Sequence, residues 1–503
     1  MIYHLPTPLV TFLLAAQLLA QDPKTAIIQL PPSIEVTGTM LADIDGDKLT
    51  DLVLACHHTT TGQRSLRVHS RQKSGPAFAS KPSRAPYQLD SDAIAFTFCD
   101  CTDAPGQELI LLSAERIALV VTEKNGERDY QPVGSHVLIW PAADDQRIVP
   151  LRHAAVDFDN DGREDLLLPH PNGWSVWFQD QAGGKPTFTR HADTTLPRRQ
   201  SSISKAMGGR GAGGDSNGFQ LRFGGGKSTG ADGLLVRTST RTPQCKALDL
   251  NGDGKLDLVA QRNGSMHAAM QTTAGKLTAK EQPLPLPENR LKVLDPAFNV
   301  QWPDVNGDGH ADLLLTTSAQ RDGAVEARVD LFLADRFGAW SDKPDCRLRM
   351  QTLANAPQVL DVDGDGKAEL VCVTLRTSAM SALTNPKAAS FDAQLNIYDF
   401  EDGKFTTPSM LSRPMPLMTD TRLKKPFLIV RPGRRGRAGD VLLHINDRVE
   451  RRFLNAKNKQ LTLASSDASS PVPPKSRILV ADEIGDDILI VTGNEVRHVR
   501  FRR

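Results

Sequence analysis

The stretch "DVDGDGKAELVC", residues 361–372, places four acidic side chains within nine positions and then continues as an apolar strand. Like charges at this spacing repel one another, so the loop needs a compensating positive charge. Oxygen-bearing side chains stand at its first, third, fifth and ninth positions, which are Asp361, Asp363, Asp365 and Glu369. Glycine at the fourth and sixth positions permits the positive φ that a tight wrap around a cation requires.

The same pattern occurs in five segments that align without gaps. They are "DIDGDKLTDLVL" from Asp43, "DFDNDGREDLLL" from Asp157, "DLNGDGKLDLVA" from Asp249, "DVNGDGHADLLL" from Asp304 and "DVDGDGKAELVC" from Asp361. Loops with alternating carboxylate and amide oxygens suit a hard cation such as Ca²⁺. The alternative is a set of Asp/Gly-rich turns that cap strands and bind nothing. Because the oxygens keep their register in all five copies, we favour the metal.

The sequence therefore predicts about five Ca²⁺ sites. The candidate ligands are Asp43, Asp45, Asp47, Asp51, Asp157, Asp159, Asp161, Asp165, Asp249, Asn251, Asp253, Asp257, Asp304, Asn306, Asp308, Asp312, Asp361, Asp363, Asp365 and Glu369. An EF-hand is excluded, because that loop needs a bidentate Glu at position 12 and flanking helices. Position 12 here is Leu, Ala or Cys, and the flanks are short and rich in Val, Leu and Ile, as in strands.

The spacing of the loops predicts the architecture. Intact loops begin at 43, 157, 249, 304 and 361, and the closest pair are 55 residues apart. Three further copies with fewer acids complete the series: one from Asp100, with Glu108 at the ninth position, one within Pro426–Ile445, and one within Arg477–Val491. After most loops a second strand, turn and strand follow, so each unit has about four antiparallel strands. The prediction is an all-β protein, a β-propeller of about eight four-stranded blades.

The ring is also predicted to close with the N-terminal strand. After the eighth loop the chain has only two more strands before Arg503, so the last blade lacks its fourth strand. The apolar stretch Thr25–Leu30 can fill that position and remove an exposed edge.

The D-x-[DN]-x-D-G-x-x-D loops running into strands resemble the FG-GAP/VCBS repeats of integrin-α-like propellers, over nearly all of the chain after residue 21. The resemblance implies Ca²⁺ in loops on one face of the ring, held by the side chains at positions 1, 3, 5 and 9, and a role in adhesion or recognition outside the cell. Seven blades is the usual number in that family and is the alternative to our count of eight.

The N-terminus indicates export. Leu9–Ala20 is an apolar run too short to span a bilayer, and it fits a secretory signal over residues 1–20 with cleavage before Gln21, although the preceding residues carry no Lys or Arg. The propeller would occupy residues 21–503, in a secreted, periplasmic or cell-surface protein without a membrane span. A formal net charge of +1 gives no global field that favours nucleic acid.

Two segments depart from the repeat. A Gly-rich insertion at about 200–235 contains two short strand-like pieces, Phe219–Phe223 and Leu234–Arg237, and its "GGGKST" lacks the spacing and helix of a phosphate loop. It is a hairpin at the rim or a loop that contacts a ligand. In the seventh unit Arg431, Arg434, Arg435 and Arg437 replace the acids. They pair with Asp440 or neighbouring acids, form an anion-binding patch, or form a solvated run of charge, which we favour here and for the C-terminal "RHVRFRR".

No catalytic motif stands out, so no residue is assigned a catalytic role. The leading hypothesis is an exported Ca²⁺-binding scaffold for an extracellular protein or glycan, with structural calcium and an oligomeric state that the sequence leaves open. The alternative is a Ca²⁺-dependent polysaccharide lyase or hydrolase with a site at the central channel of the propeller.

Overall fold

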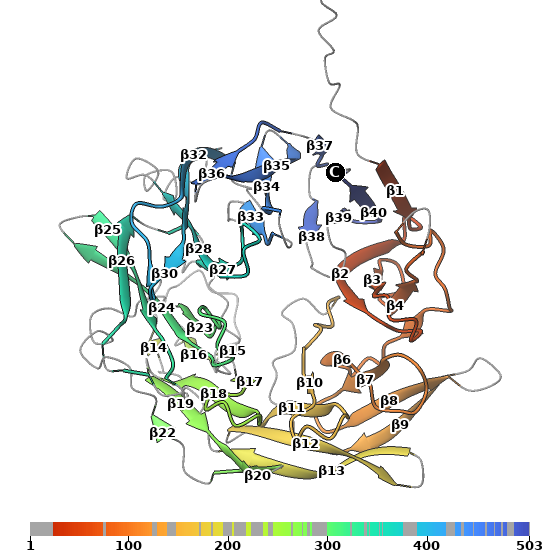
Figure 1. Cartoon of the computed structure of the whole chain (residues 1–503). Coiled ribbons are helices and arrows are strands. Elements are labelled where there is room, and N and C mark those ends of the chain that lie inside the picture. The colour runs from red at the N-terminus through yellow and green to blue at the C-terminus, as the bar shows by residue number, and fades with distance from the viewer. Residues whose placement is uncertain are drawn as a thin grey trace, which may run out of the picture.

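A computed structural model shows the chain as a closed ring of antiparallel sheets (Figure 1). It describes residues 24–501 except 74–76, 123–127, 138–146, 171–172, 183–184, 195–203, 206–217, 223–234, 240–244, 263–264, 274, 279–281, 284–298, 322–323, 336–339, 342, 352, 355, 376–389, 419–427, 434–436, 446, 458–459, 467, 474–475 and 480–486. The predicted signal segment and the degenerate loop around Asp482 lie outside the described residues. Within them, no helix has the length and hydropathy needed to cross a membrane.

Eight blades form the ring, which confirms the predicted β-propeller and the count of eight over the alternative of seven. The first strand of each blade lies nearest the centre (Figure 1). These first strands are β2 (Ile34–Ala42), β6 (Ala95–Cys99), β10 (Ala155–Val156), β17 (Cys245–Leu248), β23 (Asn299–Gln301), β27 (Gln358–Leu360), β33 (Leu428–Arg431) and β38 (Arg477–Leu479).

The second and third strands carry most of the apolar residues. The second strands are β3 (Asp51–His58), β7 (Glu108–Leu112), β11 (Asp165–His170), β18 (Asp257–Arg262), β24 (Leu313–Arg321), β28 (Glu369–Leu375), β34 (Asp440–Ile445) and β39 (Asp487–Val491). The third strands are β4 (Arg64–His69), β8 (Ile117–Thr122), β12 (Gly173–Ala182), β19 (Ser265–Ala269), β25 (Ala324–Phe332), β29 (Ser390–Tyr398), β35 (Arg448–Lys457) and β40 (Glu495–Arg500).

The outer strands are more variable. They are β5 (Tyr87–Gln88), β9 (Arg128–Gly134), β13 (Lys185–Thr194), β22 (Gln282–Pro283), β26 (Cys346–Gln351), β32 (Leu411–Met418) and β1 (Lys24–Gln29), while in the seventh blade both β36 (Gln460–Leu463) and β37 (Ala468–Pro471) pair with β35. Short hairpins β20 (Gln271–Thr273) with β21 (Lys276–Leu277) and β30 (Phe400–Glu401) with β31 (Lys404–Phe405) precede the outer strands of two blades.

The chain closes its own ring. Strand β1 pairs antiparallel with β40 over the full run Lys24–Gln29, so the N-terminal strand completes the eighth blade, as predicted. Ile28 from β1 is buried with Val496 of β40 against Leu52 and Leu54 of the first blade. Apolar side chains of adjacent blades pack face to face in this way around the ring, so the core is a series of clusters between sheets.

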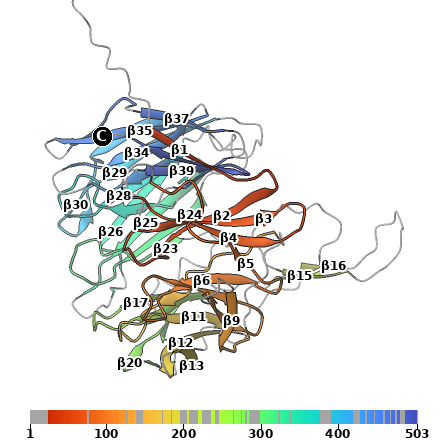
Figure 2. The same cartoon turned by 90° about the vertical axis from the view of Figure 1, so that its right-hand side faces the viewer.

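The Gly-rich insertion forms a sheet of its own. Strands β15 (Gly218–Arg222) and β16 (Leu235–Ser239) pair antiparallel, within a residue or two of the predicted pieces, and β14 (Ser204–Lys205) pairs with β16. Figure 2 shows β15 and β16 beside the ring, outside its blades. The hairpin prediction is therefore confirmed for these strands.

Candidate metal centres

All five acidic loops connect the first strand of a blade to its second strand. Because the blades repeat with the same orientation, these loops share one face of the ring, which we call the acidic face. The backbone at the fourth and sixth loop positions has positive φ in every copy. Glycine occupies most of these positions, while Lys48 (φ 67°) and Asn160 (φ 60°) adopt the same conformation in two loops. The turn geometry expected from the sequence is thus present in all five.

The first carboxylate organises each loop. Oδ1 of Asp361 accepts a hydrogen bond from the Gly364 amide at 2.6 Å, and Oδ2 accepts one from the Gly366 amide at 3.0 Å. The other four loops repeat this wrap with small changes of donor. The fifth residue likewise accepts from the amide of the seventh, as Asp365 does from Lys367 at 2.8 Å. These bonds use one lone pair of each oxygen and leave others for a cation.

Three of the loops bring carboxylates close enough to share one ion. The groups are Asp43 with Asp45 and Asp51, Asp157 with Asp159 and Asp165, and Asp361 with Asp363 and Asp365; within each, one oxygen per residue lies within 4.8 Å of the others. Two oxygens that bind one Ca²⁺ at about 2.4 Å are at most about 4.8 Å apart. The donor sets of these loops therefore fit Ca²⁺.

The remaining predicted ligands are placed differently. Asp47, Asp161 and Glu369 belong to the same loops but not to these groups. In the loops from Asp249 and Asp304 the third residue is Asn, and the described residues contain no converging trio of carboxylates there. A cation at those two loops would need the amide oxygens of Asn251 and Asn306, which each accept a bond from the amide two residues on.

The ninth residue has a structural role that the sequence did not reveal. Its carboxylate is almost fully buried in all five loops, with exposed fractions of 0% or 1%. In Asp165, Oδ2 accepts the Phe158 amide of its own loop at 3.0 Å, and Oδ1 accepts the amide of Gln179, at the end of the third strand, at 2.9 Å. Asp51, Asp257 and Asp312 bridge loop and blade in the same way. The ninth acid thus fastens the loop to its sheet.

Burial makes these carboxylates hard to ionise without a cation. Desolvation raises the pKa of Asp165 to about 7 and that of Glu369 to about 8, and the other acids of each loop add to both shifts. Burial raises the pKa of Asp51 and Asp257 to about 6 for the same reasons. Oε1 of Glu369 and Oδ1 of Asp159 are buried and make no hydrogen bond within the described part of the chain. A bound divalent cation would offset the repulsion and favour the ionised forms.

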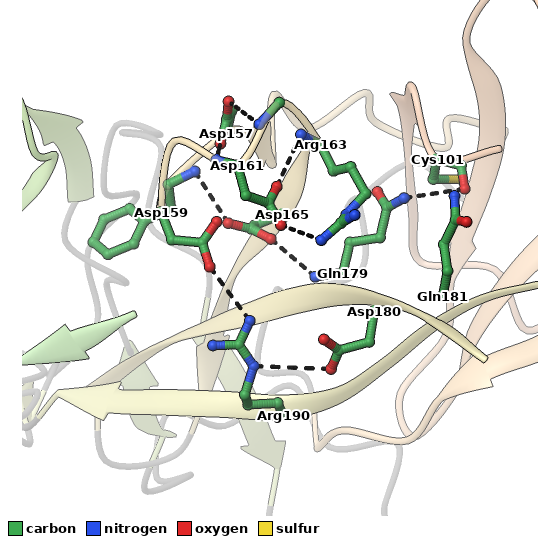
Figure 3. A network of polar contacts seen from close by, with 12 residues as sticks. Cys101, Asp157, Asp159, Asp161, Arg163, Asp165, Gln179, Asp180, Gln181 and Arg190 are labelled. Carbon is green, nitrogen blue, oxygen red and sulfur yellow. Dashed lines mark hydrogen bonds and ion pairs between the residues drawn. The ribbon is translucent and has the colours of Figure 1, made fainter. Parts of the chain in front are cut away.

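The third blade already supplies a cation to its loop (Figure 3). Arg190 of β13 approaches Asp159 at 3.3 Å and Asp180 at 3.8 Å, and its guanidinium lies 4.3 Å from the Phe178 ring centroid. Arg163 pairs with Asp161 in the same loop. The charge of this loop is therefore partly compensated by the chain itself.

Neighbouring loops of the acidic face are joined directly. The Gln107 amide donates to the Asp43 carbonyl at 2.7 Å, the Asp100 amide to Glu164 Oε2 at 2.7 Å, and the Gly433 amide to the Asp361 carbonyl at 2.7 Å. Buried glutamines add to these links. Gln179 donates to the Cys101 carbonyl at 3.2 Å (Figure 3), and Gln271 donates to the Phe158 carbonyl at 2.9 Å. Whatever fixes one loop therefore also fixes the adjacent blade.

The degenerate loops keep the ninth acid, and those of the seventh and eighth blades pair it with basic side chains. In the seventh blade the Asp440 carboxylate accepts two hydrogen bonds from the Arg431 guanidinium, at 2.6 and 2.7 Å. It also pairs with the fully buried Arg451 of β35 at 2.6 Å. The favoured interpretation of a solvated charge run is thus wrong for Arg431, which is buried and paired, whereas Arg437 is exposed. Arg434 and Arg435 lie outside the described residues.

The eighth blade follows the same rule, whereas in the second blade the acid accepts only from neutral donors. In the eighth blade Asp487 accepts from His498 Nε2 at 2.8 Å and from Arg500 at 3.1 Å. The solvated interpretation is wrong for His498, which is buried, whereas Arg500 pairs with Asp487 and is also exposed. Burial acts to raise the pKa of Asp487, but the bonds from His498 and Arg500 outweigh it, and the net pKa is lowered. In the second blade Glu108 accepts from the Cys101 amide and the Thr102 hydroxyl.

Comparison with known proteins finds one family model that matches part of the chain, and several similar solved structures. Residues 249–315 and 304–372 each match the model of the FG-GAP-like repeat. Similar solved structures include an Agrocybe aegerita lectin described as recognising non-reducing terminal N-acetylglucosamine, at 12% identity over 88% of this chain and 93% of that chain with a TM-score of 0.37. Another is rhamnogalacturonan lyase PL11 of Bacillus licheniformis, at 12% identity over 95% of this chain and 74% of that chain with a TM-score of 0.33.

A structure of BBS1N in complex with ARL6DN is similar at 10% identity over 96% of this chain and 97% of that chain, with a TM-score of 0.34. No curated protein matches the sequence. Likeness at these identities and TM-scores carries no conclusion about ligands. Residues 249–372 thus match FG-GAP-like repeats, and the described strands form an eight-bladed β-propeller.

Proposed function

We propose that this protein is an exported, Ca²⁺-stabilised propeller that serves as a binding scaffold for an extracellular protein or glycan. The observation that carries the proposal is the convergence of three carboxylates within reach of one ion in each of three loops. The loops from Asp249 and Asp304 would complete about five sites through their Asn side chains. The calcium would be structural, because the acids that would hold it also wrap the loop backbone.

The energetic effect of such ions is large compared with the stability of a domain. Extracellular modules bind Ca²⁺ with Kd on the order of 10⁻⁴ to 10⁻³ M. At ~1 mM Ca²⁺ and a Kd of ~0.1 mM, each site adds ~1.4 kcal/mol to the free energy of unfolding. Five independent sites would add ~7 kcal/mol, against a typical total of ~5–15 kcal/mol. Because neighbouring loops are hydrogen-bonded, this energy would act on the contacts between blades.

The direct test is thermal unfolding with and without calcium. We expect the midpoint in 1 mM Ca²⁺ to fall by many degrees when a chelator is added, and to recover when Ca²⁺ is restored in excess. Asp363→Ala should lower the number of bound Ca²⁺ ions, whereas Asp103→Ala, in the degenerate second loop, should not. Identical melting curves in chelator and in Ca²⁺, together with no Ca²⁺ in the purified protein by elemental analysis, would refute the proposal.

Export is tested separately. Cleavage before Gln21 would leave the ring-closing strand β1, which begins at Lys24, intact. We therefore expect the protein collected outside the cytoplasm to begin at Gln21 by N-terminal sequencing. A protein that keeps Met1 and stays in the cytoplasm would contradict export and leave the calcium proposal to its own test.

A further inference from the structure

A pocket of about 740 Å³ lies between the first two blades. It is lined by the β3–β4 turn, by the link from β5 to β6, and by Arg147 and Ile148 of the link from β9 to β10. Its volume is in the range of small-ligand sites, about 300–1,000 Å³. The acidic loops join β2 to β3 and β6 to β7 at the opposite strand ends, as Ala42 pairs with Asp51 and Cys99 with Glu108. The pocket therefore opens on the other face of the ring.

The walls of the pocket are linked by half-buried and exposed hydrogen bonds. The Arg64 guanidinium donates to the carbonyls of Asp90, Ser91 and Ala93 at 2.6, 3.0 and 3.3 Å, which fixes the β5–β6 link against β4. Arg147 pairs with Glu35 of β2 at 3.0 Å and ties the third wall to the first blade. Three chain segments are thus cross-linked around one space, which gives a pre-organised site with little ordering cost on binding.

The lining chemistry is mixed and nearly neutral. The exposed polar groups include the hydroxyls of Thr61 and Ser91, the amide of Gln63 and the carboxylate of Asp92. The half-buried Ile94 supplies aliphatic surface, while Leu89 is only 8% exposed and belongs to the core. The positive charges of Arg64, Arg147 and the adjacent Arg116 are balanced by three acids: Glu35, which pairs with Arg147, and Asp90 and Asp92, which pair with Arg116. A strongly ionic ligand would gain no net attraction here.

Donors and acceptors alternate in this pocket, and both kinds are needed by a ligand rich in hydroxyl groups. A hydroxyl donates one hydrogen bond and accepts two. A ligand hydroxyl can therefore donate to the Asp92 carboxylate and accept from the Gln63 amide nitrogen. Sugar rings also present C–H faces that would cover the half-buried Ile94. We propose that this pocket binds the terminal sugars of a neutral glycan. The inference rests on the proposed scaffold function and specifies its ligand class and its place on the ring.

The test is binding to an array of immobilised neutral oligosaccharides, with oligogalacturonate as the anionic comparison, in 1 mM Ca²⁺. We expect saturable binding to at least one neutral glycan and little to oligogalacturonate. Gln63→Ala and Asp92→Ala should each weaken binding tenfold or more without changing the melting midpoint, because both side chains are exposed. Gln72→Ala, an exposed glutamine outside the pocket, is the matched control and should bind like the wild type.

Three outcomes would overturn the pocket proposal: no binding to any neutral glycan on the array, equal binding by the wild type and both pocket variants, or binding confined to oligogalacturonate. These outcomes are distinct from failure of the calcium proposal, which appears as a chelator-independent melting curve in a protein that still binds the glycan.

Discussion

At the scale of the residue, the most constant feature of the blades is the acid at the ninth loop position. It is present at or next to the start of all eight second strands, as Asp51, Glu108, Asp165, Asp257, Asp312, Glu369, Asp440 and Asp487. Sequence spacing predicted an acid there, and assigned it to metal in the five intact loops. Spacing could not predict its backbone donors, because the Gln179 amide that binds Asp165 belongs to the third strand, β12. That pairing exists only once the sheet has formed.

The burial of Glu369 predicts how the free energy of unfolding depends on pH when calcium is absent. Without calcium the folded-state pKa of Glu369 is about 8, raised chiefly by burial, whereas the ordinary pKa of a glutamate side chain is 4.5. Between these values only the folded state holds the proton, so the free energy of unfolding falls as pH rises from 5 to 8. In chelator, Glu369→Gln should show a smaller fall than the wild type, by urea unfolding at each pH. Glu115→Gln, at an exposed site, should follow the wild type. Parallel profiles for all three proteins would contradict the burial of an ionisable Glu369.

At the scale of the element, the loop between first and second strands is the unit that joins blade to blade. Its composition was predictable from the repeat, and so were the strands that flank it. The compensation in the seventh blade was only partly predictable, because Arg451 belongs to β35 and reaches Asp440 across the sheet. The negative charge of the ninth acid is thus compensated by arginine or histidine in the last two blades. In three other blades the acids form clusters that suit a cation.

The buried pair of Arg451 with Asp440 should contribute strongly to the stability of the seventh blade. The Arg451 side chain is fully buried and bound to Asp440, so Arg451→Met leaves a buried carboxylate with one partner fewer. We expect a loss of about 3–5 kcal/mol in the free energy of unfolding, as for other broken buried pairs. Arg452→Met removes a more exposed pair with Glu450 and should cost about 0–1 kcal/mol. Urea unfolding measures both, and equal losses would show that burial of the Asp440 pair has no special role. The difference should be the same in chelator and in Ca²⁺.

At the scale of the whole molecule, the number of blades and the closing strand could be predicted because both depend on the order of repeats along the chain. The pocket between the first two blades could not, since its walls come from residues near 60, 90 and 147 that meet only when these two blades pack together. The same holds for the clusters between blades, such as the one that contains Ile28, Leu52 and Leu54. Packing of blade on blade is therefore what brings these distant residues together.

The role of closure can be tested by removing the N-terminal strand. Deletion of residues 1–29 takes away β1 and leaves β40 as a free edge with Val496 uncovered. Free edges pair with other chains, so this variant should melt at lower temperature and form concentration-dependent oligomers. Deletion of residues 1–22 keeps β1 and is the control. Size-exclusion chromatography with light scattering distinguishes the two. If the shorter chain stays monodisperse and melts with the control, then β1 does not hold the ring closed, and the eighth blade is stable with three strands.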